Sequence, residues 1–171
     1  MSSVTAADVG SFFLSLVVPV ITGVAAAGYT AYFALNRFYR EKWWEKKHAA
    51  YNQLIEKLFE LKDLYVIASD ITEMEFQADR GERDYPKAKV DWHKLNEVRS
   101  QVHRLYVLSP ISFSHNVKEL LDNLLTQDTE KNISIYEEGC LEFIAYHEMS
   151  GVIQSSIDAI VDDAKEELKF K

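Results

Sequence analysis

An uncharged and mostly apolar stretch stands near the start of the chain. From Val9 to Asn36 there are 28 consecutive residues without a formally charged side chain. At about 1.5 Å per residue, a helix of this length reaches roughly 42 Å, more than the roughly 30 Å hydrocarbon core of a bilayer. The pattern therefore predicts a single transmembrane helix, with residues 1–36 as a membrane anchor.

A cleavable signal peptide is the alternative interpretation, because Ala25-Ala26-Ala27 resembles a cleavage site. The residues before it contain neither Lys nor Arg, and the apolar run is longer than that of a signal peptide. The basic residues follow the stretch instead. This favours a retained membrane anchor, with the N-terminus outside and residues 37–171 as a cytoplasmic domain. The predicted membrane interface comprises Arg37, Arg40, Trp43, Trp44, Lys46 and Lys47. These basic residues would also attract anionic lipids, although topology determination alone explains them.

Small residues recur every four positions within the predicted span. Such a row lets the backbones of two membrane helices approach each other closely. Because a helix has 3.6 residues per turn, the row drifts around it, and only Gly23, Ala27 and Ala31 in its centre can form one tight contact. These three residues predict a homo-oligomer, although Ala and Gly are also common in membrane helices generally.

Beyond the span, apolar residues follow the period of packed helices, and neither Gly nor Pro occurs between Gly28 and Gly81. The first helix is therefore expected to continue to about Ala78. Its packing seam, spaced four and three residues apart, comprises Leu54, Leu58, Leu61, Tyr65 and Ala68. Three more helices are predicted: from Pro86 to about Leu108, from an N-cap at Ser114 to a polar loop at 127–132, and from Ser134 to Leu168. The predicted fold is all-α: one N-terminal transmembrane helix that continues into a cytoplasmic antiparallel bundle of about four helices.

Charge is distributed unevenly along the chain, whose net charge is −8. This acidity argues against binding of duplex nucleic acid through its phosphates. Residues 87–118 differ from the rest, with six Lys or Arg against two acidic residues. The single cysteine, Cys140, excludes an intramolecular disulfide and a multi-cysteine metal site.

Residue patterns typical of enzymes are missing from the sequence. It contains no His-Glu-x-x-His, no phosphate-binding glycine loop and no Gly-x-Ser-x-Gly. Cys140 and His147 lie about 10 Å apart along one predicted helix, too far to share a proton. We therefore expect no catalytic activity, no cofactor and no metal site.

The net-positive segment carries one candidate binding face on the second predicted helix. Its polar residues are spaced four and three apart, and basic residues flank them. Arg, Lys, Asn and His can together hold a phosphate and hydrogen-bond a base. The alternative is a water-facing side of an amphipathic helix, or a face paired with the acidic last helix. The candidate ligand-binding residues are Lys89, His93, Asn96, Arg99, Ser100, His103 and Arg104.

The segment after the span, Asn36-Arg-Phe-Tyr-Arg-Glu-Lys-Trp-Trp-Glu-Lys-Lys-His-Ala-Ala-Tyr51, resembles a known group of proteins. It is similar to the juxtamembrane helix of small bitopic bacterial membrane proteins with a Trp-Trp-Glu-x-Lys pattern. The layout of anchor and helical domain also resembles the membrane effectors of anti-phage systems, among them type III CRISPR systems that signal with cyclic oligoadenylate. The resemblance implies a location in the bacterial inner membrane. It also implies an antiviral effector that perturbs the membrane when it binds a cyclic oligonucleotide messenger or a partner. A non-gated membrane adaptor that tethers a cytosolic protein is the alternative.

Overall fold

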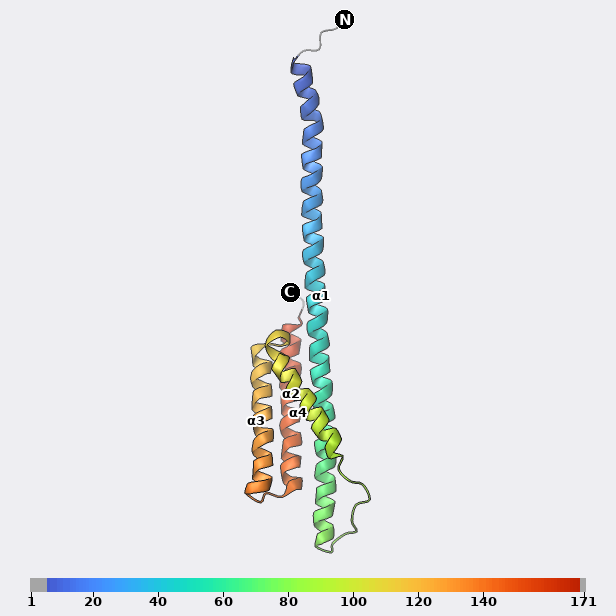
Figure 1. Cartoon of the computed structure of the whole chain (residues 1–171), viewed down its shortest axis with the longest axis vertical. Coiled ribbons are helices and arrows are strands. Elements are labelled where there is room, and N and C mark those ends of the chain that lie inside the picture. Colours follow the sequence, from blue (N-terminus) through green and yellow to red (C-terminus); the bar gives the residue numbers. More distant parts are fainter. Residues whose placement is uncertain (1–5, 170–171) are drawn as a thin grey trace. The chain divides into compact units, whose positions relative to one another are not determined.

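The computed structural model describes the backbone of residues 6–169 and the side chains of residues 19–169. This described part is all-helical and contains no strand, which confirms the all-α class of the predicted fold but not its transmembrane helix (Figure 1). Its helices are α1 (Ala6–Asp79), α2 (Trp92–Ser112), α3 (His115–Glu137) and α4 (Glu142–Glu167). The chain divides into two compact units, Met1–Glu45 and Lys46–Lys171.

The second unit is a bundle formed by the C-terminal part of α1 together with α2, α3 and α4, which alternate in direction (Figure 1). The C-terminal part of α1 begins at Lys46, and α2 runs back obliquely alongside this part of α1. The helices α3 and α4 follow as an antiparallel pair. The return is fixed by the Phe113 ring at the end of α2, which packs edge-on to Tyr51 of α1 with 5.1 Å between ring centres. The turn between α2 and α3 therefore lies at the end of the bundle where the unit begins.

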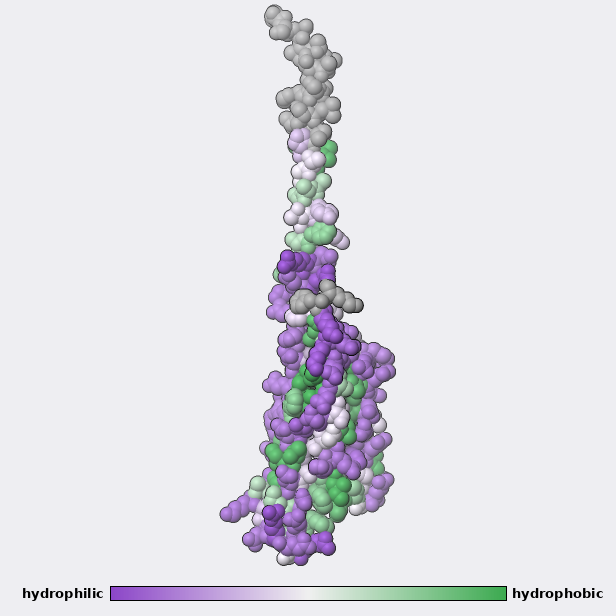
Figure 2. Space-filling model, turned by 180° about the vertical axis from the view of Figure 1, so that it is seen from behind, coloured by the Kyte–Doolittle hydropathy of each residue, from purple (hydrophilic) through white to green (hydrophobic). Residues whose placement is uncertain are grey.

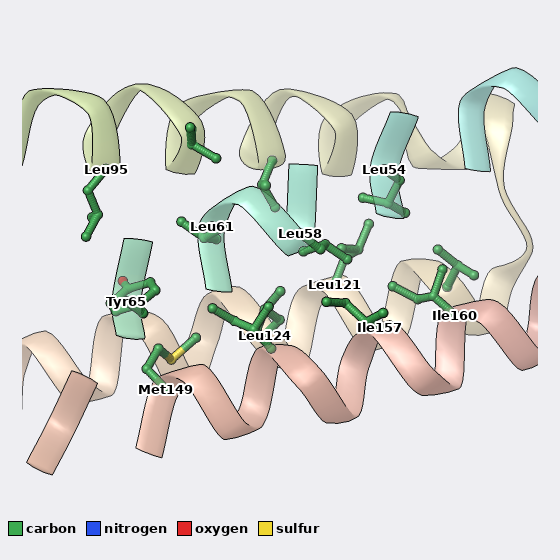
Figure 3. Packing of buried hydrophobic residues seen from close by; sticks show 14 of the residues in the cluster. Leu54, Leu58, Leu61, Tyr65, Leu95, Leu121, Leu124, Met149, Ile157 and Ile160 are labelled. Carbon is green, nitrogen blue, oxygen red and sulfur yellow. The ribbon is translucent and has the colours of Figure 1, made fainter. Parts of the chain in front are cut away.

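Buried apolar side chains from all four helices form one core (Figure 3). All five residues of the predicted seam on α1 are buried, which confirms the helical period read from the sequence. Each fully buried aliphatic side chain contributes about 1.5–3 kcal/mol of hydrophobic stabilisation. The largest fully buried side chains are Tyr51, Leu54, Leu58, Tyr65, Leu95, Val98, Leu121, Leu124, Met149, Ile153, Ile157 and Ile160.

The ends of α2 differ from the prediction. Pro86 does not begin the helix; instead the Asp91 carboxylate accepts a hydrogen bond from the Lys94 backbone N–H at 2.9 Å and caps the first turn. The helix does not end near Leu108 either, because α2 continues through Pro110 to Ser112. A proline so close to the C-terminal end disrupts the helical hydrogen bonds of only one remaining turn.

The predicted polar loop at 127–132 is wrong, because α3 continues through it to Glu137. The polar side chains there bond within the helix: the Asn132 amide, for example, donates to the Asp128 carbonyl at 2.7 Å. Ser134, predicted to begin the last helix, lies in the last turns of α3 instead, and its carbonyl accepts the N–H groups of Glu138 and Cys140. Gly139 then leaves the helix with a φ of 70°, a conformation that favours glycine. The N-cap predicted at Ser114 is confirmed, with Oγ 3.1 Å from the Val117 N–H.

The first unit is the N-terminal part of α1. Its described side chains from Pro19 to Trp43 are all exposed, and in Figure 2 they change from pale and green to purple where the charged residues begin. The hydroxyls of Thr22 and Thr30 donate to carbonyls of the preceding turn at 3.1 and 2.8 Å. None of the helices in the described part of the chain combines the length and the apolar character that a membrane crossing needs. The first ten residues of the predicted span, 9–18, lie outside the described side chains.

Candidate functional site

The structure divides the seven predicted ligand-binding residues according to two neighbouring clefts on the bundle. Lys89, in the loop before α2, lines a larger cleft together with Asn96 and Arg99. Asn96 and Arg99 also line a smaller cleft, together with Ser100 and His103. His93 and Arg104 are exposed and line neither cleft. Five of the seven residues thus line at least one cleft, and Asn96 and Arg99 line both.

Arg99 is the half-buried member of the group and has partners on two other helices. Its Nη2 donates to Asp128 of α3 at 3.2 Å and to the Tyr65 hydroxyl of α1, and the Tyr65 hydroxyl in turn donates to Asp128. The Nε lies 3.0 Å from the other Asp128 oxygen, but its N–H is not aligned for a hydrogen bond. We call Tyr65, Arg99 and Asp128 the polar clamp. It joins α1, α2 and α3 by charge and hydrogen bonding in the interior of the bundle.

Burial determines the electrostatics of the clamp. It raises the pKa of the Tyr65 hydroxyl, and the neighbouring Asp128 carboxylate raises it further, so the hydroxyl stays protonated and donates. Burial works against the charged Arg99 guanidinium, but Tyr65 and Asp128 outweigh it and raise its pKa. The clamp is therefore a cation held between a carboxylate and a neutral phenol.

The larger cleft has a volume of about 600 Å³, within the range of sites for small molecules. Three aromatic rings line it: Trp92 of α2, Tyr136 of α3 and Tyr146 of α4. The Trp92 and Tyr146 rings lie 5.6 Å apart at their centres and form one wall. Rings of this kind can stack on a flat, aromatic ligand such as a nucleobase.

Neutral amides and charged groups of both signs complete the lining of the larger cleft. Asn96 and Asn132 present amides, Lys89 and Arg99 are cations, and Glu75 and Glu142 are carboxylates. Arg99 is paired with Asp128, whereas Lys89 forms no ion pair or hydrogen bond with the described residues. Burial, with the nearby Glu142 carboxylate, raises the pKa of Tyr146 to about 12, so this phenol is neutral at physiological pH. The cleft suits a ligand with a flat ring and at most a small negative charge.

The smaller cleft, of about 520 Å³, is less suited to an anion. Its lining includes the carboxylates of Asp122 and Asp128. Asp122 accepts a hydrogen bond from the Tyr106 hydroxyl at 2.8 Å, and Asp128 belongs to the clamp. Two carboxylates against the single cation Arg99 leave this cleft with no excess positive charge.

The residues predicted to act at the membrane lie mostly on the first unit. Gly23, Ala27 and Ala31 are exposed on α1, and a Cβ added at Gly23 would meet no atom within 4 Å. Arg37 pairs with Glu41 at 2.8 Å on the same helix. Lys47 belongs to the bundle and forms an ion pair with Glu167 of α4.

Metal-ligating residues do not gather in the described part of the chain, where no three His, Cys, Asp or Glu side chains are grouped as a metal site requires. Comparison of the chain with protein-family models, with curated proteins and with solved structures gives no match. The resemblance to small bitopic bacterial proteins therefore stays a prediction that rests on the residues quoted for it.

Sequence reasoning missed the partners that surround Arg99. Asp128 stands four residues after Leu124 and seven after Leu121, so the spacing of the α3 core places a carboxylate at a buried position. A carboxylate at a buried helix position requires a cation or a hydrogen-bond donor nearby. The spacing of Asp128 from Leu121 and Leu124 could therefore have indicated such a partner from the sequence. Tyr136 and Trp92 offered no such signal, because the cleft that they line depends on how the helices pack.

Proposed function

We propose that this chain is a signal-gated membrane effector of bacterial defence, whose bundle binds a nucleotide messenger in the larger cleft and thereby perturbs the membrane. The observation that carries this proposal is the cleft itself. Three residues proposed from the sequence as nucleotide ligands, Lys89, Asn96 and Arg99, line it together with three aromatic rings. Rings to stack on a base, amides to read its edge and cations for phosphate are the groups that a nucleotide needs.

The size and charge of the cleft constrain how a cyclic oligonucleotide would bind. A volume of about 600 Å³ holds roughly one nucleotide unit rather than a whole ring. With Glu75 and Glu142 in its lining, one cleft also carries little net positive charge. In the homo-oligomer that Gly23, Ala27 and Ala31 predict, several clefts would each take one nucleotide of the same ring.

Membrane attachment is supported by the first unit of the chain. The uncharged stretch from Val9 to Asn36 is long enough to cross a bilayer as a helix. Large apolar side chains are more than half exposed along its described part, which a protein in water rarely tolerates. These side chains are Val20, Ile21, Val24, Phe33 and Leu35. The Thr22 and Thr30 hydroxyls bond to backbone carbonyls, which lowers the cost of placing them in lipid.

The proposed gating depends on α1, because this one helix contributes to the proposed span, to the cleft and to the clamp. This helix carries the proposed membrane span, supplies Thr72 and Glu75 to the cleft, and is bonded to α2 and α3 through Tyr65 of the clamp. A ligand phosphate that reaches Arg99 competes with Asp128 for the guanidinium. The competition loosens the bonds that hold α1 in the bundle, and the change is passed along the helix that enters the membrane.

The test is calorimetric titration of the detergent-solubilised full chain with cyclic oligoadenylates of different ring sizes. The Lys89→Glu variant should lower the affinity at least tenfold, because Lys89 lines the cleft. Lys87→Glu is the matched control, because Lys87 is also an exposed lysine, two residues away, and lines neither cleft. Equal affinity in both variants, or no heat with any ring, would contradict the nucleotide proposal.

A non-gated membrane adaptor is the second candidate, and the clamp itself favours it. With Arg99 already neutralised by Asp128, the polar face on α2 has less charge to offer an anion than its sequence indicates. An adaptor would bind a protein along an exposed helix face and leave the membrane intact. It predicts that vesicles carrying the chain stay sealed with every nucleotide tested.

A further inference from the structure

Three apolar side chains stand exposed side by side on the last turns of α2. Val107, Leu108 and Ile111 are 59%, 45% and 85% exposed. Residues three and four apart share a face of a helix, so Ile111 lies next to both of the others. Arg104 precedes them on the same face, and it has no ion pair or hydrogen bond in the part of the chain that the structure describes. We call these four residues the α2 end patch.

The patch lies at the end of the bundle where the second unit begins. The chain turns directly after it, and the turn is bonded to α1: the Ser114 N–H donates to the Tyr51 hydroxyl at 3.4 Å, and Phe113 packs on the Tyr51 ring. Seven residues separate Tyr51 from Trp44, part of the proposed membrane interface. Even fully extended, seven residues reach no more than about 25 Å.

We infer that the α2 end patch rests on the lipid surface and forms a second membrane contact of the bundle. This inference rests on the proposed membrane anchoring. The three apolar side chains would enter the boundary between headgroups and acyl chains, while Arg104 binds lipid phosphate. An unpaired cation next to exposed apolar side chains is the composition of helices that lie in a membrane interface.

A protein partner explains the patch less well than lipid does. A stable protein interface covers about 800 Å² on each side and involves some 20–30 residues. Val107, Leu108 and Ile111 form a far smaller area, which suffices for an anchored protein that needs only to tilt toward its membrane.

Most acidic residues at the same end of the bundle form hydrogen bonds or ion pairs within the protein. They therefore repel anionic lipid less than their number indicates. Asp163 accepts hydrogen bonds from Tyr51 and Ser114 at 2.7 and 2.8 Å. Asp162 pairs with Lys165, and Glu167 pairs with Lys47. Among the acidic residues from Asp162 to Glu167, Asp163 therefore has hydrogen bonds but no ion pair, and Glu166 has neither with the described residues.

The experiment places a polarity-sensitive fluorophore on single cysteines in the full chain, reconstituted in nanodiscs that contain anionic lipid. The background variant is Cys140→Ser, which removes the natural cysteine, and the reporting variant is Ile111→Cys. Tyr136→Cys is the matched control, because Tyr136 is 81% exposed but lies about 33 Å along α3 from Ser114. Phe33→Cys, within the proposed span, reports on the anchor itself.

Lipids that carry a spin label near the headgroup quench a fluorophore that touches them. We expect at least twofold quenching at positions 111 and 33 and none at position 136. Quenching at 33 without quenching at 111 overturns the inference and leaves the membrane anchor standing. No quenching at 33 contradicts the anchor and the inference together. A label at 111 that is shielded from water but unquenched by lipid also overturns the inference, because a protein then covers the patch.

Discussion

Replacing Asp128 by Asn tests whether the polar clamp holds the bundle together. The substitution keeps the shape of the side chain and removes its charge, so Arg99 loses its counter-ion and Tyr65 loses a charged acceptor. Asp128 is the only partner of Arg99 in the described part of the chain that carries a formal negative charge. The variant therefore leaves a half-buried guanidinium without compensation.

The size of the effect follows from how deeply the pair is buried. Removing one partner of a fully buried ion pair costs about 3–5 kcal/mol, whereas a surface pair contributes at most about 1 kcal/mol. The side chain of Asp128 is 12% exposed and that of Arg99 is 28% exposed, so the clamp lies nearer the buried limit, with some solvent screening. We expect Asp128→Asn to lower the free energy of unfolding by about 2–3 kcal/mol. For a domain of this size that corresponds to a fall in Tm of roughly 10 °C.

Thermal unfolding of the detergent-solubilised full chain, followed by circular dichroism, measures this change. Asp122→Asn is the matched control, because Asp122 on the same helix also accepts a hydrogen bond from a tyrosine of α2, but at the exposed surface. We expect the control to shift the free energy of unfolding by no more than about 0.5 kcal/mol. If Asp128→Asn destabilises the protein no more than Asp122→Asn does, the clamp does not join the helices and the gating proposal loses its basis.

Further predictions concern helix ends and alkaline pH. Gly139→Ala should destabilise the bundle by about 1–2 kcal/mol in urea unfolding, because the residue adopts a φ of 70°; Gly151→Ala, in open space within α4, should stabilise it by up to about 1 kcal/mol, and the same sign for both would contradict the assignment of the α3 end. Burial raises the pKa of Tyr51 to about 12, and its bond to Asp163 adds to the shift. Because the unfolded phenol ionises near pH 10, stability should be full below pH 10 and fall as the pH rises toward 12. Tyr51→Phe should flatten this decline in pH-dependent unfolding curves, and an unchanged decline would count against the buried hydroxyl as its source.

Most of the helices of the bundle could be predicted, because the period of apolar residues along a helix depends only on their spacing in the sequence. The seam from Leu54 to Ala68 is buried as expected, and Ser114 caps α3 as its position before an apolar run indicated. The errors share a cause. Residues 127–132 are polar, which is typical of a loop, but Asp128 there is buried by its pairing with Arg99, and that contact is 29 residues away in sequence.

The candidate site was predictable only in part for the same reason. The polar spacing of the second predicted helix identified Lys89 and Asn96 as residues of one face, with Arg99 flanking it, and all three line one cleft in the structure. The neutralisation of Arg99 and the aromatic walls contributed by Tyr136 and Tyr146 come from other helices. Tertiary packing therefore decides which charges of the face remain available to a ligand.

Dye release from sealed vesicles that contain the full chain tests whether the cleft controls the membrane. We expect these vesicles to stay sealed alone and to release dye when a cyclic oligoadenylate is added on the side of the bundle. Release should persist with Lys87→Glu and be lost with Lys89→Glu. Vesicles that stay sealed while calorimetry shows the same ligand bound would contradict the claim that the cleft controls the membrane.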